Sequence, residues 1–371
     1  MRSVIIPAGL GLNSRYIGRA KNYKGVVIIC ELLALSFNKP VRPRFSFKSF
    51  ICRGESNPHG WGLAFYPSWG KAVQVIKEPG GSHQSPLAEY VSEYSEICSR
   101  TIISHIRYQS SGSDVFASTH PFQREYQGRD YAFAHNGTLT GFRSLPLERF
   151  HPIGDTDSEY VFCYLLGAIA ERGLQEWTEN DMRWLGEILR KINYYGDFNC
   201  LFSNGEYLFC YHDQNNYKGL CFTNRSAPYG PVQLEDSELE IDLSEEKDLE
   251  QTGFIVATRK LTKNEHWINF CPGELMVLKS GCAVYSNMTG SKELKILETL
   301  RRSEIRVSLE KIADSLRVDI DDTKELISSL VSKKFIKQDS RDEVDQFHRK
   351  ATYYTRRSKR DEIDRRLELL S

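Results

Sequence analysis

Residues 30–36 read Cys-Glu-Leu-Leu-Ala-Leu-Ser, a cysteine followed at once by an apolar run. The pattern is typical of a mature N-terminus, yet residues 1–29 precede it in this chain. The apolar run, with the Val-Val-Ile-Ile stretch at 26–29 before it, predicts one buried strand. We therefore expect Cys30 to act as the first residue of the working protein.

Three downstream segments carry polar residues of the kind that would surround such a cysteine. They are Ser104-His105-Ile106-Arg107-Tyr108, Ala134-His135-Asn136-Gly137 and Thr156-Asp157-Ser158-Glu159. The first two continue apolar runs that predict core strands, and Asn136-Gly137 predicts a turn that closes the second strand. Because the segments follow one another in the span 30–159, we interpret them as parts of one site.

An N-terminal cysteine supplies both a nucleophile and a base. Its α-amino group has a pKa of about 7.7–8.0, so at neutral pH a useful fraction can accept the thiol proton. The thiolate would attack a carboxamide carbonyl, form a thioester and release ammonia, and water would then hydrolyse the thioester. Asn136 and Gly137 are predicted to donate the hydrogen bonds that the oxyanion needs.

Arg107 and Asp157 are candidates for holding the charged ends of an amino-acid substrate. A guanidinium at the end of a core strand can bind an α-carboxylate with two hydrogen bonds. Asp157 could pair with an α-ammonium group. Each residue also has a structural alternative, since Asp157 could cap the helix that begins near Ser158 and Arg107 could form a structural ion pair.

The composition excludes several classes of protein. The chain has 371 residues, 40% hydrophobic and 12% aromatic, which is enough for a sizeable core. Lys+Arg and Asp+Glu are both 49, which disfavours a globally basic nucleic-acid binder, and no apolar run is long enough to span a membrane. The nine cysteines form no C-x-x-C pair. They predict a reducing compartment, no disulfide framework and no metal site.

Residues 1–29 contain five basic and no acidic residues. This composition is typical of an organellar transit peptide, but a propeptide or a mis-assigned start would also explain it. We expect a cytoplasmic protein, or an organellar one if the segment is a transit peptide.

The rest of the chain divides by composition. Residues 30–285 are strand-rich with two helices, and 286–293 form a linker. Residues 294–340 predict three short helices and a strand, the pattern of a winged-helix-like module, and 341–371 form a charged tail.

The stretch from Cys30 to about Leu278 resembles a class II glutamine amidotransferase domain of the N-terminal nucleophile hydrolase type. Besides the segments above, the matching motifs are His59-Gly60-Trp61-Gly62, Thr119-His120-Pro121-Phe122 and Phe198-Asn199-Cys200-Leu201-Phe202-Ser203-Asn204-Gly205. The chain looks most similar to the stand-alone branch of bacterial amidotransferases and γ-glutamyl hydrolases. The resemblance implies an α+β fold, a four-layer αββα sandwich.

The same resemblance implies the role of each site residue. Cys30 would be nucleophile and base, Asn136 and Gly137 the oxyanion hole, and Arg107 and Asp157 the glutamine clamps. It further implies that Ser110 helps to hold the carboxylate and that His120 forms a wall of the pocket, although His120 could equally be structural.

The resemblance also sets expectations for substrate and partner. The substrate would be L-glutamine or a γ-glutamyl small molecule, with no cofactor. Only 86 residues follow position 285, too few for an ammonia-consuming synthase, so an ammonia-accepting synthetase or another protein partner is expected.

The alternative is a catalytically inactive domain that senses a metabolite and acts through the winged helix. DNA binding is not expected, because Asp319, Asp321 and Asp322 open the helix that would approach the phosphates. A protein-interaction role suits the module better.

Overall fold

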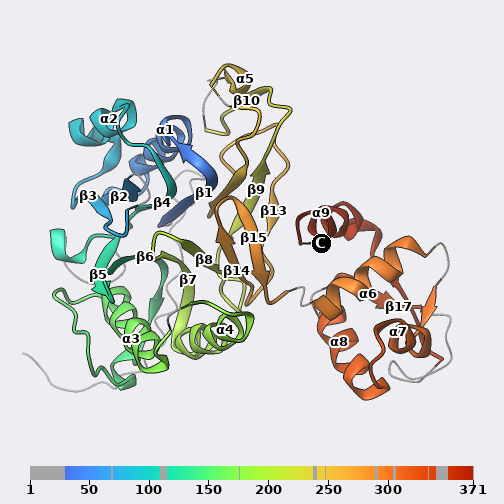
Figure 1. Cartoon of the computed structure of the whole chain (residues 1–371). Coiled ribbons are helices and arrows are strands. Elements are labelled where there is room, and N and C mark those ends of the chain that lie inside the picture. The colour runs from blue at the N-terminus through green and yellow to red at the C-terminus, as the bar shows by residue number, and fades with distance from the viewer. Residues whose placement is uncertain are drawn as a thin grey trace, which may run out of the picture.

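Two large antiparallel sheets dominate the computed structural model (Figure 1). The structure describes residues 30–67, 70–108, 115–174, 176–236, 240–246, 248–288, 291–303, 306–332, 334–339 and 350–370. The part of the predicted first strand that precedes Cys30 lies outside these residues. No helix in the described part of the chain is long and apolar enough to cross a membrane.

Cys30 directly precedes β1 (Glu31–Val41), the central strand of the first sheet. The seven strands of this sheet are, in spatial order, β13 (Ile268–Asn269), β9 (Cys221–Arg225), β12 (Gly253–Ala257), β1, β4 (Ser99–Ile106), β2 (Trp61–Pro67) and β3 (Gln74–Glu78). The six strands of the second sheet are β15 (Cys282–Ser286), β14 (Leu275–Lys279), β8 (Tyr207–Tyr211), β7 (Gly196–Ser203), β6 (Arg129–Leu139) and β5 (Phe122–Tyr126).

The apolar run after Cys30 is buried on both of its faces. Leu32 and Ala34 point into the core between the two sheets, whereas Leu33 belongs to the core on the opposite face. Side chains alternate in this way because successive residues of a strand point to opposite sides. The helices α1 (Arg44–Cys52) and α2 (Pro86–Glu93) cover that opposite face (Figure 1).

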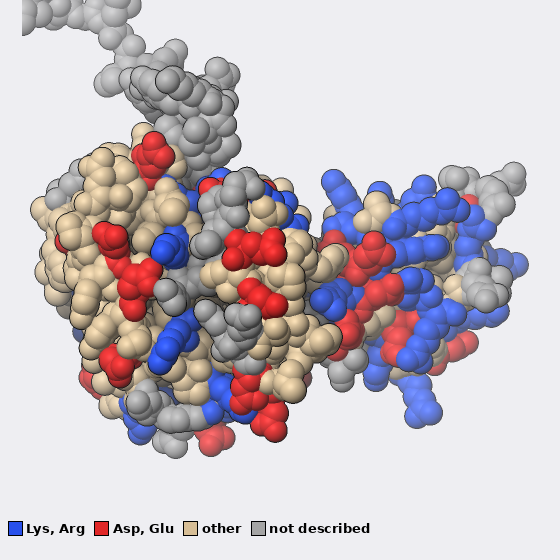
Figure 2. Space-filling view, turned by 90° about the horizontal axis from the view of Figure 1, so that it is seen from above, with Lys and Arg blue, Asp and Glu red and all other residues tan. Residues whose placement is uncertain are grey.

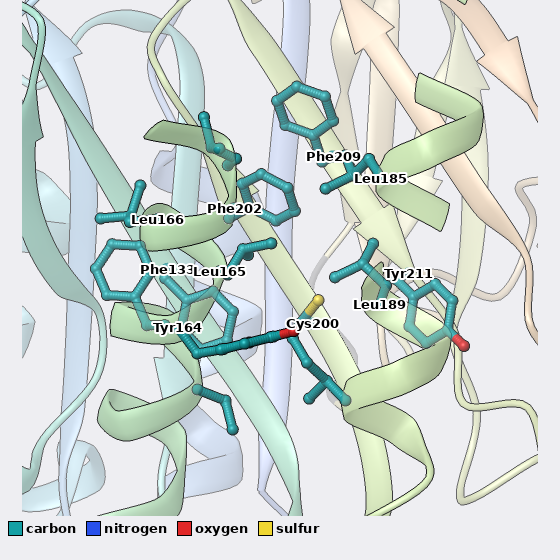
Figure 3. Close-up of a cluster of buried hydrophobic side chains, with 14 of the residues drawn as sticks. Phe133, Tyr164, Leu165, Leu166, Leu185, Leu189, Cys200, Phe202, Phe209 and Tyr211 are labelled. Carbon is teal, nitrogen blue, oxygen red and sulfur yellow. The ribbon is translucent and has the colours of Figure 1, made fainter. Parts of the chain in front are cut away.

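The outer face of the second sheet is covered by α3 (Asp157–Arg172) and α4 (Glu179–Asn193). Figure 3 shows Leu165 and Leu185 of these helices packed against the sheet around Phe202. The layers therefore follow the order helix, sheet, sheet, helix, which confirms the expected αββα sandwich. Thr178 caps α4 through a capping box with Asp181.

A short ribbon projects from the end of the first sheet. It consists of β10 (Pro231–Gln233), β11 (Glu240–Asp242) and α5 (Leu243–Glu246), and its buried apolar side chains form a small cluster around Val232 and Leu243.

A second, smaller unit follows β15. Its elements are, in chain order, α6 (Ser291–Arg302), β16 (Val307–Ser308), α7 (Leu309–Leu316), α8 (Ile320–Ser332), β17 (Ile336–Gln338), β18 (Thr352–Thr355) and α9 (Arg360–Leu370). The strands form an antiparallel sheet in the order β16–β18–β17. The segment 341–371 was expected to be a charged tail, but it supplies the central strand of this sheet and a packed helix. Its apolar positions explain the difference, because Tyr353 and Ile363 are fully buried in the core of the unit.

Arg366 of α9 joins the small unit to the sandwich. Its guanidinium is fully buried and donates to both carboxylate oxygens of Glu274, at 2.7 and 3.0 Å, and to the carbonyl oxygen of Asn269 at 3.1 Å. The Glu274 carboxylate also accepts from the backbone N–H of Cys271 (2.8 Å) and the hydroxyl of Ser286 (3.1 Å). The two charges can be buried because the pair is bidentate and both groups make further hydrogen bonds.

Removing the guanidinium alone should therefore be costly. We expect Arg366→Ala to lower the free energy of unfolding by about 3–5 kcal/mol, because Glu274 would stay buried without a counter-charge. Urea denaturation measures this loss, and the pair Arg366→Met with Glu274→Leu should recover most of it. Arg365→Ala is the control, since the ion pair that Arg365 makes among the described residues is an exposed one with Glu368. A loss below 1 kcal/mol in Arg366→Ala would contradict the assignment.

Candidate active site

The thiol of Cys30 lies just before the first residue of the central strand β1, where Tyr108, the residue after Arg107, holds it. The Tyr108 N–H donates to the sulfur at 3.1 Å, and the thiol donates to the Tyr108 carbonyl oxygen at 3.0 Å. Burial raises the pKa of the Cys30 thiol, whereas the Tyr108 hydrogen bond and the charges of Lys218 and Arg107 lower it. Burial outweighs these groups, so the pKa of the thiol is raised overall. The thiol is therefore positioned in its protonated form, and a base must remove its proton before it can attack.

Asn136 reaches Cys30 from the second sheet. Its side chain is 1% exposed, and its Nδ2 donates to the Cys30 carbonyl oxygen at 2.6 Å. The predicted turn at Asn136-Gly137 is wrong, because β6 continues through both residues to Leu139 and pairs with β7 along this length. The structure thus brings the carboxamide of Asn136 beside Cys30 from within a strand.

Gly137 is required by a close approach rather than by a turn. Its φ is +156°, and a Cβ atom here would lie 2.0 Å from the carbonyl oxygen of Asp197 and 2.6 Å from the ring of His135. The His135 Nε2 donates to the same carbonyl oxygen (3.1 Å), which leaves its Nδ1 to accept from the hydroxyl of Ser158 (2.8 Å). These contacts fix the backbone next to Asn136 and leave no space for a side chain at position 137.

Asp157 links the start of α3 to the end of β6. Its buried carboxylate accepts from the backbone N–H of Leu139 (2.7 Å) and of Ser158 (2.8 Å). The N-cap of the helix is Thr156, whose hydroxyl accepts from the Glu159 N–H. Asp157 therefore has a structural role at the first turn, and its contact with a substrate ammonium stays a prediction.

Arg107 follows β4 and is buried, with 3% of its surface exposed. Its backbone N–H donates to the Gly60 carbonyl oxygen at 2.7 Å, and its Nη1 lies 3.4 Å from the His59 carbonyl oxygen. The His-Gly motif noted in the sequence thus serves to hold Arg107. The structure places Arg107 one residue from the Tyr108 backbone that binds the thiol.

His120 lies next to a second buried histidine, His105. The two ring centroids are 4.2 Å apart, and no ring nitrogen of either side chain has a hydrogen-bond partner among the described residues. Burial lowers the pKa of His105 to about 3 and lowers that of His120 well below its usual value. Arg107 adds to both shifts, so the pair lies within its electrostatic range. Ser110, the remaining predicted site residue, lies outside the described residues.

These depressed pKa values predict acid sensitivity. The folded state keeps both rings neutral, while the unfolded chain binds protons below about pH 6.5, so stability should fall as the pH decreases from about 6.5 toward 3. Each ring contributes up to about 1.4 kcal/mol per pH unit in this window. Urea midpoints at pH 7 and pH 5 should therefore differ less in His105→Gln than in the wild type. The exposed His151→Gln should leave the difference unchanged, and equal pH dependence in all three proteins would contradict the assignment.

Lys218 is a cation near Cys30 that the sequence did not indicate. It influences the pKa of the thiol more strongly than Arg107 does, and burial lowers its own pKa. The polar run before it predicts a loop, but only the pairing of distant strands shows where this loop lies. In the described part of the chain, no cluster of His, Cys, Asp and Glu has the arrangement of a metal site.

Comparison with known proteins agrees with this geometry. The family model described as "Glutamine amidotransferases class-II" matches residues 29–301. The chain is 48% identical over 348 residues to the protein MJ1515 of Methanocaldococcus jannaschii, covering 92% of this chain and 97% of the relative. It is 38% identical over 253 residues to the "Putative glutamine amidotransferase YafJ" of Escherichia coli, covering 66% of this chain and 96% of the relative.

A solved structure extends the likeness to three dimensions. It is the crystal structure of a predicted glutamine amidotransferase from Pseudomonas aeruginosa, with a TM-score of 0.53 and 33% identity over 69% of this chain and 100% of the other. The E. coli and P. aeruginosa matches cover 66% and 69% of this chain, whereas the archaeal match covers 92% and so includes part of the C-terminal unit. The chain belongs to the class II glutamine amidotransferases and carries a C-terminal unit besides the sandwich.

Proposed function

We propose that the protein hydrolyses the side-chain amide of L-glutamine, or of a γ-glutamyl conjugate, through a thioester on Cys30. The observation that carries the proposal is the hydrogen bond from the buried Asn136 carboxamide to the Cys30 carbonyl oxygen, beside a Gly137 that admits no side chain. A nucleophile with candidate oxyanion donors on the neighbouring strand is what acyl transfer requires.

The first half of the reaction forms the thioester. The free α-amine of Cys30 takes the thiol proton, and the thiolate attacks the γ-carbonyl carbon. Asn136 Nδ2 and the Gly137 N–H stabilise the negative oxygen of the tetrahedral intermediate. The intermediate collapses, the C–N bond breaks, and the α-ammonium returns its proton to the departing ammonia or amine.

The second half regenerates the enzyme. Water attacks the thioester while the α-amine takes its proton. The C–S bond breaks, the α-ammonium returns this proton to the departing sulfur, and glutamate leaves. The mechanism requires that the bond between Ile29 and Cys30 be absent from the active protein, because an amide nitrogen cannot act as this base. Arg107, Asp157, Ser110 and His120 would hold the glutamyl end of the substrate. The ammonia would pass to a partner enzyme or protein.

Ammonia release from L-glutamine tests the proposal directly. A chain that begins at Cys30 should produce glutamate and ammonia in equal amounts, as measured by a coupled glutamate dehydrogenase assay. The same chain with an additional residue before Cys30 should be inactive, because it lacks the free amine. If the two proteins hydrolyse glutamine equally, the α-amine is not the base.

We further propose that the C-terminal unit is of the winged-helix type and binds a protein partner. Its element order supports this proposal, because β16 precedes the consecutive helices α7 and α8, and β17 and β18 follow them to complete a three-stranded sheet. Figure 2 shows many Lys and Arg side chains on the unit, but acidic side chains lie among them. The exposed carboxylates of Asp321 and Asp322 open α8, which disfavours contact of that helix with phosphates. Salt-dependent DNA binding by the full chain would count against a protein partner.

A further inference from the structure

The strand register places Lys218 at the same end of the strands of the first sheet as Cys30. Leu33 of β1 is opposite Ala257 of β12, and Ala257 is opposite Cys221 of β9. Because both pairings are antiparallel, β1 and β9 run in the same direction, and Cys221 is level with Leu33. Lys218 precedes Cys221 by as many residues as Cys30 precedes Leu33, so both stand at one end of the sheet.

The loop that carries Lys218 is also fastened to the second sheet, next to Asn136. Asn199, which is opposite Asn136 in the register of β6 and β7, donates from Nδ2 to the Tyr217 carbonyl oxygen at 2.9 Å. The buried carboxylate of Asp213 accepts from the Tyr217 N–H at 3.1 Å. Lys218 therefore follows a residue that is fixed from both directions, and its backbone is held in a left-handed conformation with a φ of +55°.

Arg107 and Lys218 flank Cys30 from opposite sides. The strands follow the spatial order β9, β12, β1 and β4, so Lys218 precedes the strand on one side and Arg107 follows the strand on the other. In the proposed function, Arg107 holds the α-carboxylate of the glutamyl half. The scissile amide then lies at Cys30, and the amine half extends toward Lys218.

Within the described part of the chain, the surroundings of Lys218 leave its ammonium group available to a ligand. Among the described residues, Nζ makes no ion pair with a carboxylate, and its close contact is the ring of Tyr217, 4.9 Å from the ring centroid. The charges of Asp197 and Glu31 raise the pKa of Lys218 by electrostatic interaction without a direct contact. A half-buried cation without a direct counter-ion is suited to binding an anion.

We propose that Lys218 binds a carboxylate on the amine half of the substrate, so that the preferred substrates are γ-glutamyl derivatives of amino acids or short peptides. This inference rests on the proposed binding of the glutamyl half by Arg107, but not on the thioester chemistry. Lys218 would act as a specificity residue for the leaving group, on the side of Cys30 opposite to Arg107.

A binding experiment separates this inference from the catalytic proposal. The protein is the Cys30→Ala chain that begins at position 30, and the ligands are γ-glutamylglycine and γ-glutamylmethylamide, of which only the first carries a carboxylate on its amine half. Calorimetry should show γ-glutamylglycine binding at least about tenfold more tightly, as expected for a charge-assisted hydrogen bond. Lys218→Gln should reduce this preference to within about twofold, and Lys218→Arg should retain most of it.

Lys279→Gln is the matched control, because Lys279 also lies over a tyrosine ring, at 4.6 Å from the centroid of Tyr207, but at the far end of the second sheet. It should leave the preference unchanged. Equal binding of the two ligands, or a preference that survives Lys218→Gln, would overturn the role of Lys218 while leaving glutamine hydrolysis untouched. Failure of both ligands to bind would overturn the glutamyl site together with this extension of it. If the chain with Cys30 intact did not hydrolyse glutamine while the Cys30→Ala chain bound the ligands selectively, only the thioester mechanism would be refuted.

Discussion

Replacing Cys30 by alanine is expected to lower kcat/KM for glutamine hydrolysis by at least about four orders of magnitude, with little effect on the fold. The thiol is the only proposed nucleophile, and the same residue carries the base. The loss should be almost entirely in kcat, because Arg107 and Asp157 would still bind the glutamyl end. Steady-state ammonia release and a calorimetric Kd for glutamine measure the two effects separately.

Cys98→Ala is the matched control for this substitution. Cys98 is also a free, partly exposed cysteine, but it lies next to β4 at the strand end opposite to Arg107. It should retain full activity. Substantial hydrolysis by Cys30→Ala, or equal losses in the two variants, would show that another group attacks the amide.

Gly137→Ala should have the second largest effect, a fall in kcat/KM of at least about a hundredfold. The new Cβ atom would lie 2.0 Å from the Asp197 carbonyl oxygen, so β6 and β7 would have to separate where Asn136 points at Cys30. The loss of one oxyanion donor costs about 2.7–4 kcal/mol in other enzymes. We also expect a lower free energy of unfolding, measured by urea denaturation, since the strand pair itself is disturbed.

Gly173→Ala controls for the backbone conformation alone. Gly173 ends α3 with a φ of +67°, and a Cβ atom there would meet no atom within 4 Å. We expect this variant to lose about 1 kcal/mol of stability and no activity. If Gly137→Ala retained the rate of the wild type, the close approach to Asp197 would be irrelevant to the site.

The residues predicted for the site lie in short motifs, and the structure places Cys30, Arg107 and Asn136 on neighbouring elements, although their roles stay predictions. The apolar run after Cys30 indicates a strand buried on both faces, and the structure confirms it. Asn136-Gly137 shows where a local rule fails. The dipeptide is a common turn signal, but here the glycine is needed because the Asp197 carbonyl oxygen approaches from the next strand. That contact depends on tertiary packing, which the local sequence does not encode.

Lys218 and α9 could not be located from the sequence for a similar reason. Lys218 is far from Cys30 along the chain. Only the pairing of β1 with β12 and of β12 with β9 places the residue before β9 level with Cys30. The charges of α9 suggest a solvated tail, yet Arg366 is buried because Glu274 and the Asn269 carbonyl oxygen satisfy it. In a sequence, the two residues of a buried ion pair cannot be distinguished from two exposed charged residues, because their pairing depends on the tertiary structure.

The state of the chain at Cys30 in active material is the most direct test of the mechanism. Intact-mass spectrometry combined with N-terminal sequencing should be applied to protein purified in its glutamine-hydrolysing form. We predict that the active chain begins with an unmodified Cys30 and that blocking its α-amine by acetylation removes the activity. Full glutamine hydrolysis by a chain that retains Ile29, with the α-amine of Cys30 tied into a peptide bond, would contradict the proposed base.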